Sequence, residues 1–223
     1  AAWSGICGAC EKIKVIKAQD TAMNRLYDKE KGILKLLDPP FENMSEIGYI
    51  SSYPAGVREN GGQYTHAAVW FIISLFETGR YEKAEELLNA INPIRHAFTP
   101  KAAEEYAAEP YVVCGDVYAS GEGGWSWYTG AAGWLYRAIT DYYLGITVEG
   151  DSVSFDPRFV TPEKIKVKIS HRGVTFYAEL VRGDKNGRVM ISIDGVRYNG
   201  DTIKVSERLG GKTIVAERVK DEG

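Results

Sequence analysis

Two stretches of the chain, 63–78 and 125–144, carry apolar or small side chains on nearly every face of a helix. A helix of that kind is buried among other helices, because no face remains polar enough for water. Gly79 and Gly145 follow the two stretches, and glycine is a common residue just past the end of a helix. The helical period of the second stretch rests on Trp127, Ala131, Trp134, Leu135, Ala138, Ile139 and Tyr142. We therefore predict two buried helices in the first part of the chain.

Weaker helical patterns surround these two stretches. Residues 81–90 are amphipathic, so they predict the second arm of a helical hairpin, and 100–108 predicts a short surface helix. Residues 5–27 predict a further helix. Its expected buried face holds Ile13, Ile16, Ala22, Met23 and Leu26. A short strand is expected at 33–37, where two prolines stop it.

After Gly145 the pattern changes from helical to alternating. Short runs of alternating apolar and polar residues are separated by turns rich in Gly, Asn and Asp, which predicts strands joined by hairpins. The runs are 146–155 (two strands), 164–170, 175–181, 189–193, 202–205 and 213–219. The predicted fold class is therefore α+β, with a helical domain over 1–145 and an antiparallel β-sandwich over 146–223.

The composition is that of a folded protein and excludes some partners. The net charge of −3 provides no electrostatic attraction to nucleic acid or to an anionic membrane. No apolar run approaches the roughly 20 residues of a membrane span, and no signal-peptide pattern opens the chain. The chain begins with Ala1-Ala2-Trp3, without an initiator Met and inside an apolar segment, so we expect a fragment of a longer protein.

The three cysteines are an odd number, which predicts a reducing compartment rather than a disulfide framework. Cys7 and Cys10 have the spacing of a zinc or redox pair. The other candidate zinc ligands, Cys114, His66 and His96, lie far along the chain, and a redox pair is expected after a strand rather than in a helical pattern. We expect buried helical thiols and no metal site.

Three irregular polar segments, 49–66, 109–118 and 121–130, lead into or lie between the predicted buried helices. Gly-rich turns before Gln63 and around Thr129-Gly130 expose backbone N–H groups, which suit an anion. The first segment also concentrates hydrogen-bonding residues at the start of a helix, namely Arg58, Glu59, Asn60, Gln63, Tyr64, Thr65 and His66. The segments together predict a pocket for a hydroxylated or anionic ligand.

Four motifs occur in order within these segments and beside them. They read Tyr-Pro-Ala-Gly-Val-Arg-Glu-Asn-Gly-Gly-Gln-Tyr-Thr-His (53–66), Asn-Pro-Ile-Arg-His (92–96), Glu-Pro-Tyr-Val-Val (109–113) and Gly-Gly-Trp-Ser-Trp-Tyr-Thr-Gly-Ala-Ala-Gly-Trp (123–134). Over about 30–160 the chain closely resembles the C-terminal part of glycoside hydrolase family 94. That family contains cellobiose, chitobiose and β-1,2-oligoglucan phosphorylases and the C-terminal region of cyclic β-1,2-glucan synthases. The first and fourth motifs look closer to the β-1,2-glucan branch.

The resemblance implies that 1–145 form the last helices of an (α/α)6 barrel, ahead of a β-sandwich over 146–223. It implies reversible phosphorolysis with inversion, in which phosphate attacks the anomeric carbon while one Asp protonates the leaving oxygen. Phosphate replaces the water and general base of an inverting hydrolase, so inorganic phosphate is a co-substrate and no cofactor is expected. By this resemblance His66, Thr129 and Gly130 match the family's phosphate ligands.

The resemblance also assigns residues to the sugar. Arg58 and Glu59 match residues that hydrogen-bond the acceptor-side sugar, and Tyr53 matches a residue that lines the sugar site. The cellobiose enzymes have Lys at the position of Arg58, so the acceptor preference is expected to differ. Asp116 is expected to face the same pocket.

The sequence departs from the family at the catalytic acid. The family's general acid lies in an Asp-Trp-Asn-Asp-type segment upstream of the four motifs, and no such segment occurs here. A phosphate-binding Arg of an earlier helix is also missing. We therefore expect a C-terminal fragment that does not catalyse alone. Its expected partners are a β-linked glucoside or oligosaccharide, phosphate, and the N-terminal half of the same protein.

The oligomeric state stays open, with a homodimer as one candidate. The expected location is cytoplasmic, at the inner membrane if the parent is a glucan synthase.

Structural roles compete with these assignments. His66 also suits the start of a helix, Thr129-Gly130 also suits a helix N-terminus, and Glu59 can simply pair with Arg58. Helical spacing favours a core position for Trp125 and Trp127 over sugar stacking. His96 is expected to be structural, His171 incidental and the sandwich a packing support.

Two other classes of function stay open. One is a non-catalytic carbohydrate-binding or scaffold module of a cyclic β-1,2-glucan synthase-like protein. The other is a helical-repeat interaction protein, which the lack of a 34-residue period disfavours.

Overall fold

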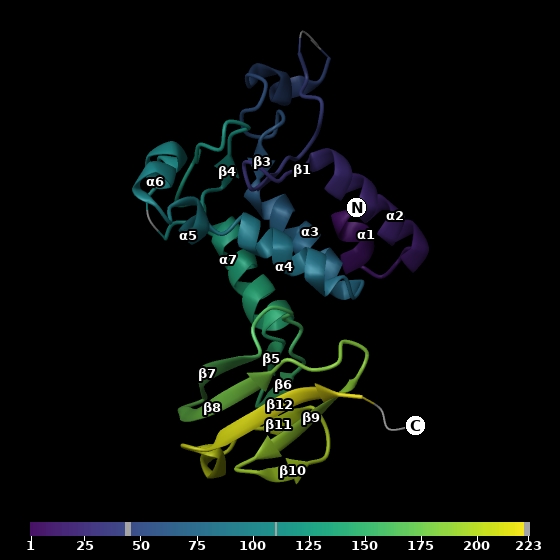
Figure 1. Cartoon of the computed structure of the whole chain (residues 1–223), viewed down its shortest axis with the longest axis vertical. Helices are drawn as coiled ribbons and strands as arrows, with labels where there is room; N and C mark the ends of the chain where they lie inside the picture. The colour runs from purple at the N-terminus through teal and green to yellow at the C-terminus, as the bar shows by residue number, and fades with distance from the viewer. Residues whose placement is uncertain (43–45, 110, 221–223) are drawn as a thin grey trace. The chain divides into compact units, whose positions relative to one another are not determined.

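The computed structural model describes residues 1–42, 46–109 and 111–220. Packing separates the chain into two compact units, Ala1–Tyr136 and Arg137–Gly223. Most helices belong to the first unit, and the two larger sheets belong to the second (Figure 1). The predicted α+β class is confirmed. Residues 43–45 and 110, which fall in segments predicted to be irregular, lie outside the described residues.

The first unit consists of helices connected by long loops with very short strands. Its helices are α1 (Ala2–Ile6), α2 (Lys12–Leu26), α3 (Thr65–Glu77), α4 (Tyr81–Ala90), α5 (Pro93–His96), α6 (Pro100–Tyr106) and α7 (Thr129–Arg137, which extends one residue beyond the unit), with a 3-10 turn η1 (Gly48–Ser52). Its strands form two antiparallel pairs, β1 (Tyr27–Asp28) with β2 (Ile33–Leu34) and β3 (Gln63–Tyr64) with β4 (Asp116–Val117).

Helix α3 is the buried helix that the sequence predicts. It contacts α1 and α4, and α4 has the bounds predicted for it, Tyr81–Ala90. The helix begins at Thr65 rather than at Gln63, because Gln63 and Tyr64 pair with β4 as a strand. Its buried residues are Thr65, Ala68, Val69, Phe71, Ile72, Ile73, Ser74, Leu75 and Phe76.

The helix predicted over 5–27 is in fact two helices. Helix α1 ends at Ile6 and α2 begins at Lys12. Between them Gly8 has a φ of +63°, which lies outside the right-handed helical region. Cys7 and Cys10 lie in this break and are exposed. The prediction of buried helical thiols is therefore wrong, because the helical period does not continue through this loop.

The buried face of α2 also differs from the predicted one. Ile13 is 71% exposed, whereas Val15 and Gln19 are buried. The Gln19 amide nitrogen donates to the backbone carbonyl of Ser74 (3.0 Å) and to its hydroxyl (2.9 Å). The amide oxygen of Gln19 accepts from the Thr78 hydroxyl at 3.1 Å. A buried polar side chain, together with Val15, thus joins α2 to the rest of the unit, and the predicted apolar face does not.

This contact predicts that replacing a polar residue of α2 lowers the stability more than replacing an apolar residue of the same helix. Gln19→Ala is expected to lower the free energy of unfolding by about 2 kcal/mol, because the Ser74 and Thr78 groups stay buried without their partner. Ile13→Ala is expected to change it by less than about 0.5 kcal/mol, because this side chain is already in water. Denaturant unfolding measured by circular dichroism decides between them. A larger loss from Ile13→Ala than from Gln19→Ala would mean that α2 packs by its apolar spacing.

The helix predicted over 125–144 begins later and is less buried than expected. It starts at Thr129, because Trp127 has a φ of +64°, a left-handed conformation that cannot continue into a right-handed helix. Its last part, Ala138–Tyr143 (η2), is a π-helix. Trp125 is 54% and Trp127 is 72% exposed, so the core position favoured for these indoles is wrong.

The second unit contains two sheets. Its strands are β5 (Ile146–Glu149), β6 (Ser152–Phe155), β7 (Lys164–His171), β8 (Val174–Val181), β9 (Arg188–Ile193), β10 (Val196–Tyr198), β11 (Thr202–Lys204) and β12 (Thr213–Val219), with a 3-10 turn η3 (Glu207–Leu209). One sheet has the order β10-β9-β12-β8-β7 and the other β11-β6-β5. Every predicted run forms a strand, and the short exposed strand β10 is the one that the pattern does not predict.

Strand pairing in the second unit is antiparallel except between β8 and β12, which run parallel. A wholly antiparallel arrangement is therefore wrong at this pair. Hairpin turns force neighbouring strands to run antiparallel, but no hairpin joins β8 to β12, so their relative direction is set by the sheet as a whole.

Both sheets of the second unit share one buried apolar cluster. Val153 and Phe155 come from the smaller sheet, and Phe176 and Leu180 from the larger one. Tyr143 of η2 packs against this cluster. Packing therefore divides the chain before Arg137, ahead of the change in sequence pattern at Gly145. No helix within the described ranges is long and apolar enough to cross a membrane.

Candidate functional site

The short pairing of β3 with β4 joins two of the polar segments. Gln63 pairs with Val117 and Tyr64 with Asp116. At the first residue of α3, the Thr65 amide donates to the Gly115 carbonyl at 2.9 Å. The pairing therefore fixes Asp116 beside the residues that start α3, although the two are far apart in the sequence.

Asn60 shapes the turn that carries Arg58 and Glu59. Its side chain is fully buried, accepts from the Phe41 amide at 2.7 Å, and donates to the carbonyls of Phe41 (3.0 Å) and Tyr53 (2.8 Å). Arg58 has a φ of +50°, an uncommon conformation for a residue with a side chain. Asn60 therefore uses its polar groups inside the protein, and its own amide donates to the Val57 carbonyl at 3.0 Å, which closes the turn that contains Arg58.

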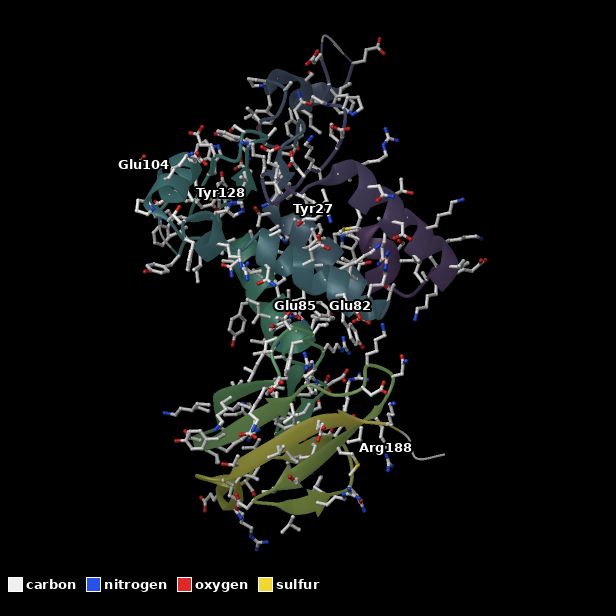
Figure 2. The ribbon with its side chains drawn as sticks, viewed as in Figure 1. Tyr27, Glu82, Glu85, Glu104, Tyr128 and Arg188 are labelled. Carbon is white, nitrogen blue, oxygen red and sulfur yellow. The ribbon has the colours of Figure 1, made fainter. Side chains whose placement is uncertain are left out.

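The third polar segment attaches to the same place. The Gly124 amide donates to the backbone carbonyl of Asp116 at 2.9 Å, and the Trp125 amide donates to the Asp116 carboxylate at 3.0 Å. A Cβ added to Gly124 would lie 2.3 Å from Asp116 Oδ2, so a glycine is required for this approach. The segment then continues through Tyr128, labelled in Figure 2, into α7.

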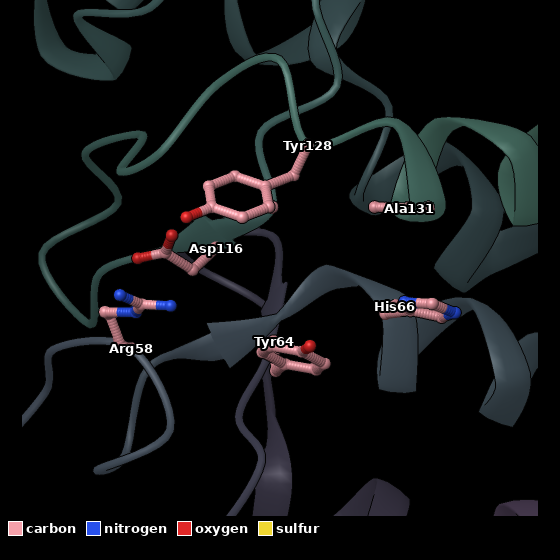
Figure 3. A pocket seen from close by; sticks show the side chains of 8 residues that line it. Arg58, Tyr64, His66, Asp116, Tyr128 and Ala131 are labelled. Carbon is pink, nitrogen blue, oxygen red and sulfur yellow. The ribbon is translucent and has the colours of Figure 1, made fainter. Parts of the chain in front are cut away.

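The three segments and the first turn of α7 line one open pocket of about 80 Å³, which has room for several water-sized groups. Figure 3 shows its two ends: Arg58, Asp116 and Tyr128 face one another at one end, and His66 and Ala131 lie at the other. The lining residues are Arg58, Tyr64, His66, Gly115, Asp116, Tyr128, Gly130 and Ala131.

Four of the seven residues selected from the sequence line this pocket, namely Arg58, His66, Asp116 and Gly130. Glu59 and Tyr53 are not among the lining residues, but each lies beside Arg58. Thr129 is exposed beside Gly130 and is not among the lining residues. Sequence reasoning counted Tyr64 among the polar residues before the helix without giving it a role, and it missed Tyr128, although both lie inside a motif directly before the first residue of a helix.

Arg58 is held by rings and by carboxylates. Its guanidinium carbon lies 5.1 Å from the centre of the Tyr53 ring and 5.8 Å from that of Trp125. Its Nε is 3.6 Å from Glu59 Oε2. Burial tends to lower the pKa of Arg58, but the neighbouring Glu59, Tyr53 and Asp116 outweigh it and the pKa is raised. The group stays cationic with its charge already compensated.

Asp116 is the most buried charged group of the pocket, at 2% exposure. Its Oδ1 accepts from Trp125, while Oδ2 has no hydrogen-bond partner among the residues that the structure describes. Burial raises the pKa of Asp116, against the opposing effects of the Trp125 N–H and the Arg58 charge. The result is a carboxyl group with one acceptor oxygen left for a ligand.

The raised pKa predicts how Asp116 affects stability with pH. Because its folded-state pKa lies above the usual 3.8, folding is favoured most below that value, and stability is lost as the pH rises through the raised pKa. Asp116→Asn has no proton to lose, so the melting temperature of the variant relative to wild type is expected to be higher at pH 7.5 than at about pH 4. Thermal unfolding at both pH values measures this, and a difference independent of pH would contradict it.

His66 occupies the other end of the pocket against aromatic rings. Its ring stacks on Tyr64 (6.3 Å between centres, 4° between planes) and contacts Trp70 at 4.5 Å. Its Nε2 is buried and has no hydrogen-bond partner within the described ranges. Burial lowers the pKa of His66, so the imidazole is neutral at pH 7 and has one N–H to donate.

Gly130 lets the first turn of α7 approach His66. A Cβ at this position would lie 3.1 Å from His66 Cε1, closer than an ordinary contact. His96, by contrast, stacks on Tyr106 and lies outside the pocket lining. Across the described ranges no group of three or more His, Cys, Asp or Glu side chains could hold a metal ion.

Comparison with known proteins agrees with the four motifs. Residues 1–145 match the catalytic domain of the glycosyl hydrolase 94 superfamily. The chain belongs to this family. The match covers the whole of the pocket and ends where the sequence pattern changes at Gly145.

Curated relatives in the family include a synthase and phosphorylases. The cyclic β-(1,2)-glucan synthase NdvB of Rhizobium meliloti (strain 1021) is 40% identical over 200 residues, which are 86% of this chain and 7% of that protein. Solabiose phosphorylase of Paenibacillus borealis is 27% identical over 91% of this chain and 27% of its own length. Cellobionic acid phosphorylase of Neurospora crassa is 26% identical over 98% of this chain and 26% of its own length. The chain thus spans about a quarter or less of these relatives.

Proposed function

We propose that this chain supplies one wall of the catalytic site of an inverting glycoside phosphorylase, with the residues that bind phosphate and the acceptor sugar. One observation carries the proposal: Arg58, His66, Asp116 and Gly130, which come from the three polar segments, line a single pocket. Membership of the glycosyl hydrolase 94 superfamily supports the chemistry, because relatives in it are named as phosphorylases.

Phosphate is proposed to bind at the His66 end. The first turn of α7 has backbone N–H groups without helical partners, and the helix dipole favours an anion there. Gly130 keeps this turn close to His66. The neutral imidazole would donate one hydrogen bond, and the exposed Thr129 hydroxyl would donate another.

The acceptor sugar is proposed to bind at the Arg58 end. A sugar hydroxyl can both accept and donate a hydrogen bond. The Arg58 guanidinium would donate to the hydroxyl groups of a β-linked glucoside, and the carboxylates of Glu59 and Asp116 would accept from them. Tyr53 contacts Arg58 and is proposed to line the same site. One relative is named for a sugar acid, cellobionic acid, and another for solabiose, so family membership leaves the charge of the acceptor open.

The general acid is proposed to come from outside residues 1–223, because the sequence has no Asp-Trp-Asn-Asp segment. Residues 1–145 would then be the last helices of an (α/α)6 barrel, and 146–223 a supporting β-sandwich. We propose a cytoplasmic location for the chain, at the inner membrane if its parent is a glucan synthase.

The test is phosphorolysis by the full-length product of the reading frame that encodes this chain. With an α-glycosyl phosphate donor and a sugar acceptor, release of inorganic phosphate is expected, together with the reverse reaction on a β-glucoside. The product of phosphorolysis should carry the α configuration, which NMR of the fresh reaction identifies. Release of free sugar with no dependence on phosphate would show a hydrolase instead.

A second candidate follows from the 40% identity to the glucan synthase NdvB, of which this chain matches 7%. In that case the chain is a non-catalytic carbohydrate-binding or scaffold module of a cyclic β-1,2-glucan synthase-like protein. Binding of β-1,2-linked glucan without turnover of any glycosyl phosphate by the full-length product would favour this candidate.

A further inference from the structure

Two carboxylate oxygens beside Arg58 have no hydrogen-bond partner among the described residues. They are Asp116 Oδ2, on a residue that lines the pocket, and Glu59 Oε2, which lies 3.6 Å from Arg58 Nε on a residue outside the lining. The Glu59 side chain is 14% exposed, and Asp116 is 2% exposed. Buried carboxylate oxygens without partners are unfavourable, so a ligand that brings hydrogen-bond donors to them is stabilised. An ionised carboxylate can accept hydrogen bonds but cannot donate them, so the ligand must supply donors, which the hydroxyl groups of a sugar provide.

The charges at this end of the pocket are unequal. Arg58 carries one positive charge, and Glu59 and Asp116 carry a negative charge each when ionised. Arg58 is also occupied, since its Nε lies 3.6 Å from Glu59 and its guanidinium faces the Asp116 carboxylate (Figure 3). Clamping a ligand carboxylate would require Arg58 to give up these carboxylates. The Arg58 end of the pocket therefore favours hydroxyl groups and repels a further negative charge.

Phosphate does not conflict with this arrangement, because it is placed at the opposite end. His66 and the first turn of α7 lie away from Arg58 and Asp116 across the pocket (Figure 3). No carboxylate is among the lining residues of that end. The pocket thus offers an anion site at the His66 end and, at the Arg58 end, a site that disfavours a negatively charged ligand.

We propose that the acceptor site selects uncharged sugars and excludes sugar acids, with Asp116 accepting a hydrogen bond from a sugar hydroxyl and Glu59 adding a second negative charge beside it. The inference rests on the proposed function and narrows its substrate class. A ligand carboxylate next to two buried carboxylates meets like charges in a region of low dielectric, where the repulsion is much stronger than in water.

The experiment compares acceptors in the full-length product of the reading frame. D-Glucose is compared with D-gluconate and D-glucuronate, each with the same α-glucose 1-phosphate donor at constant ionic strength. We expect kcat/KM for glucose to exceed that for either acid by about tenfold or more. Asp116→Asn and Glu59→Gln each remove one negative charge with little change of shape. Each is therefore expected to lower the ratio of kcat/KM for glucose to kcat/KM for the sugar acid. Glu104→Gln, an exposed carboxylate of α6 (Figure 2), is the matched control and should leave the ratio unchanged.

If the wild-type protein used either sugar acid with the same kcat/KM as glucose, the inference would be overturned while the phosphorylase function would stand. A ratio that neither Asp116→Asn nor Glu59→Gln alters would have the same consequence. If no acceptor is turned over, the proposed function fails, and binding to this chain decides the inference separately. Saturation-transfer NMR should then show a signal for bound glucose and none for glucuronate. Asp116→Asn should weaken the glucose signal. Equal signals from the two sugars would overturn it.

Discussion

His66→Ala is expected to lower kcat/KM for phosphate by about 100-fold in the full-length product of the reading frame. A change of this size corresponds to the loss of one hydrogen bond to a charged group. The buried Nε2 of the neutral imidazole has no hydrogen-bond partner within the described ranges, and Gly130 lets the first turn of α7 approach the Cε1 and Nδ1 side of the same ring. Because the lost donor would serve the anion, KM for phosphate should rise and kcat should fall. KM for the acceptor sugar, which is placed at the Arg58 end, should change much less. Initial rates at varied phosphate and varied acceptor separate the two.

Loss of packing is the competing explanation for this result. His66 stacks on Tyr64 and contacts Trp70, so alanine also leaves a cavity. His66→Gln keeps a donor in a smaller side chain and should recover part of the phosphate affinity. His171→Ala changes a partly exposed histidine of the second unit, which bonds to the Gly150 carbonyl, and should not affect KM for phosphate. A His66→Ala protein that melts normally and keeps its phosphate KM would refute the assignment of His66 as a phosphate ligand.

Gly145→Ala is expected to destabilise the second unit by about 3 kcal/mol or more, beyond the cost of a left-handed residue alone. Gly145 has a φ of +64°, and a Cβ there would lie 1.7 Å from the carbonyl oxygen of Asp156. The same two residues are joined by a hydrogen bond from the Asp156 amide to the Gly145 carbonyl at 2.7 Å. Backbone cannot move aside as a flexible side chain can, so the ends of β5 and β6 must separate. Hydrogen exchange of the amides in these two strands measures the loss.

Gly150→Ala is the matched control for this prediction. Gly150 lies in the turn between β5 and β6 with a φ of +60°, but nothing lies within 4 Å of an added Cβ. Its substitution should show the strain of the left-handed conformation alone, about 1 kcal/mol. Equal effects of the two substitutions would mean that the contact with Asp156 carries no cost.

The sequence by itself determined the elements that depend on near neighbours. Helix α4 has its predicted bounds, and every predicted run after Gly145 forms a strand. These outcomes follow from periodicity and turn residues, which act over a few positions. The motifs also sufficed to place the chain in the glycosyl hydrolase 94 superfamily and to select Arg58, His66, Asp116 and Gly130, which line one pocket.

The tertiary structure alone decided which side chains are buried and which segments meet. Gln19 is buried and Ile13 exposed because the partners of Gln19 lie on α3, outside any window of the sequence around α2. The indoles of Trp125 and Trp127 are exposed because a left-handed residue delays the start of α7, and no local propensity predicts that conformation for tryptophan. The unpartnered oxygens of Glu59 and Asp116 arise in the same way. They come together through the pairing of β3 with β4, and long-range pairing of this kind leaves no periodic trace in the sequence.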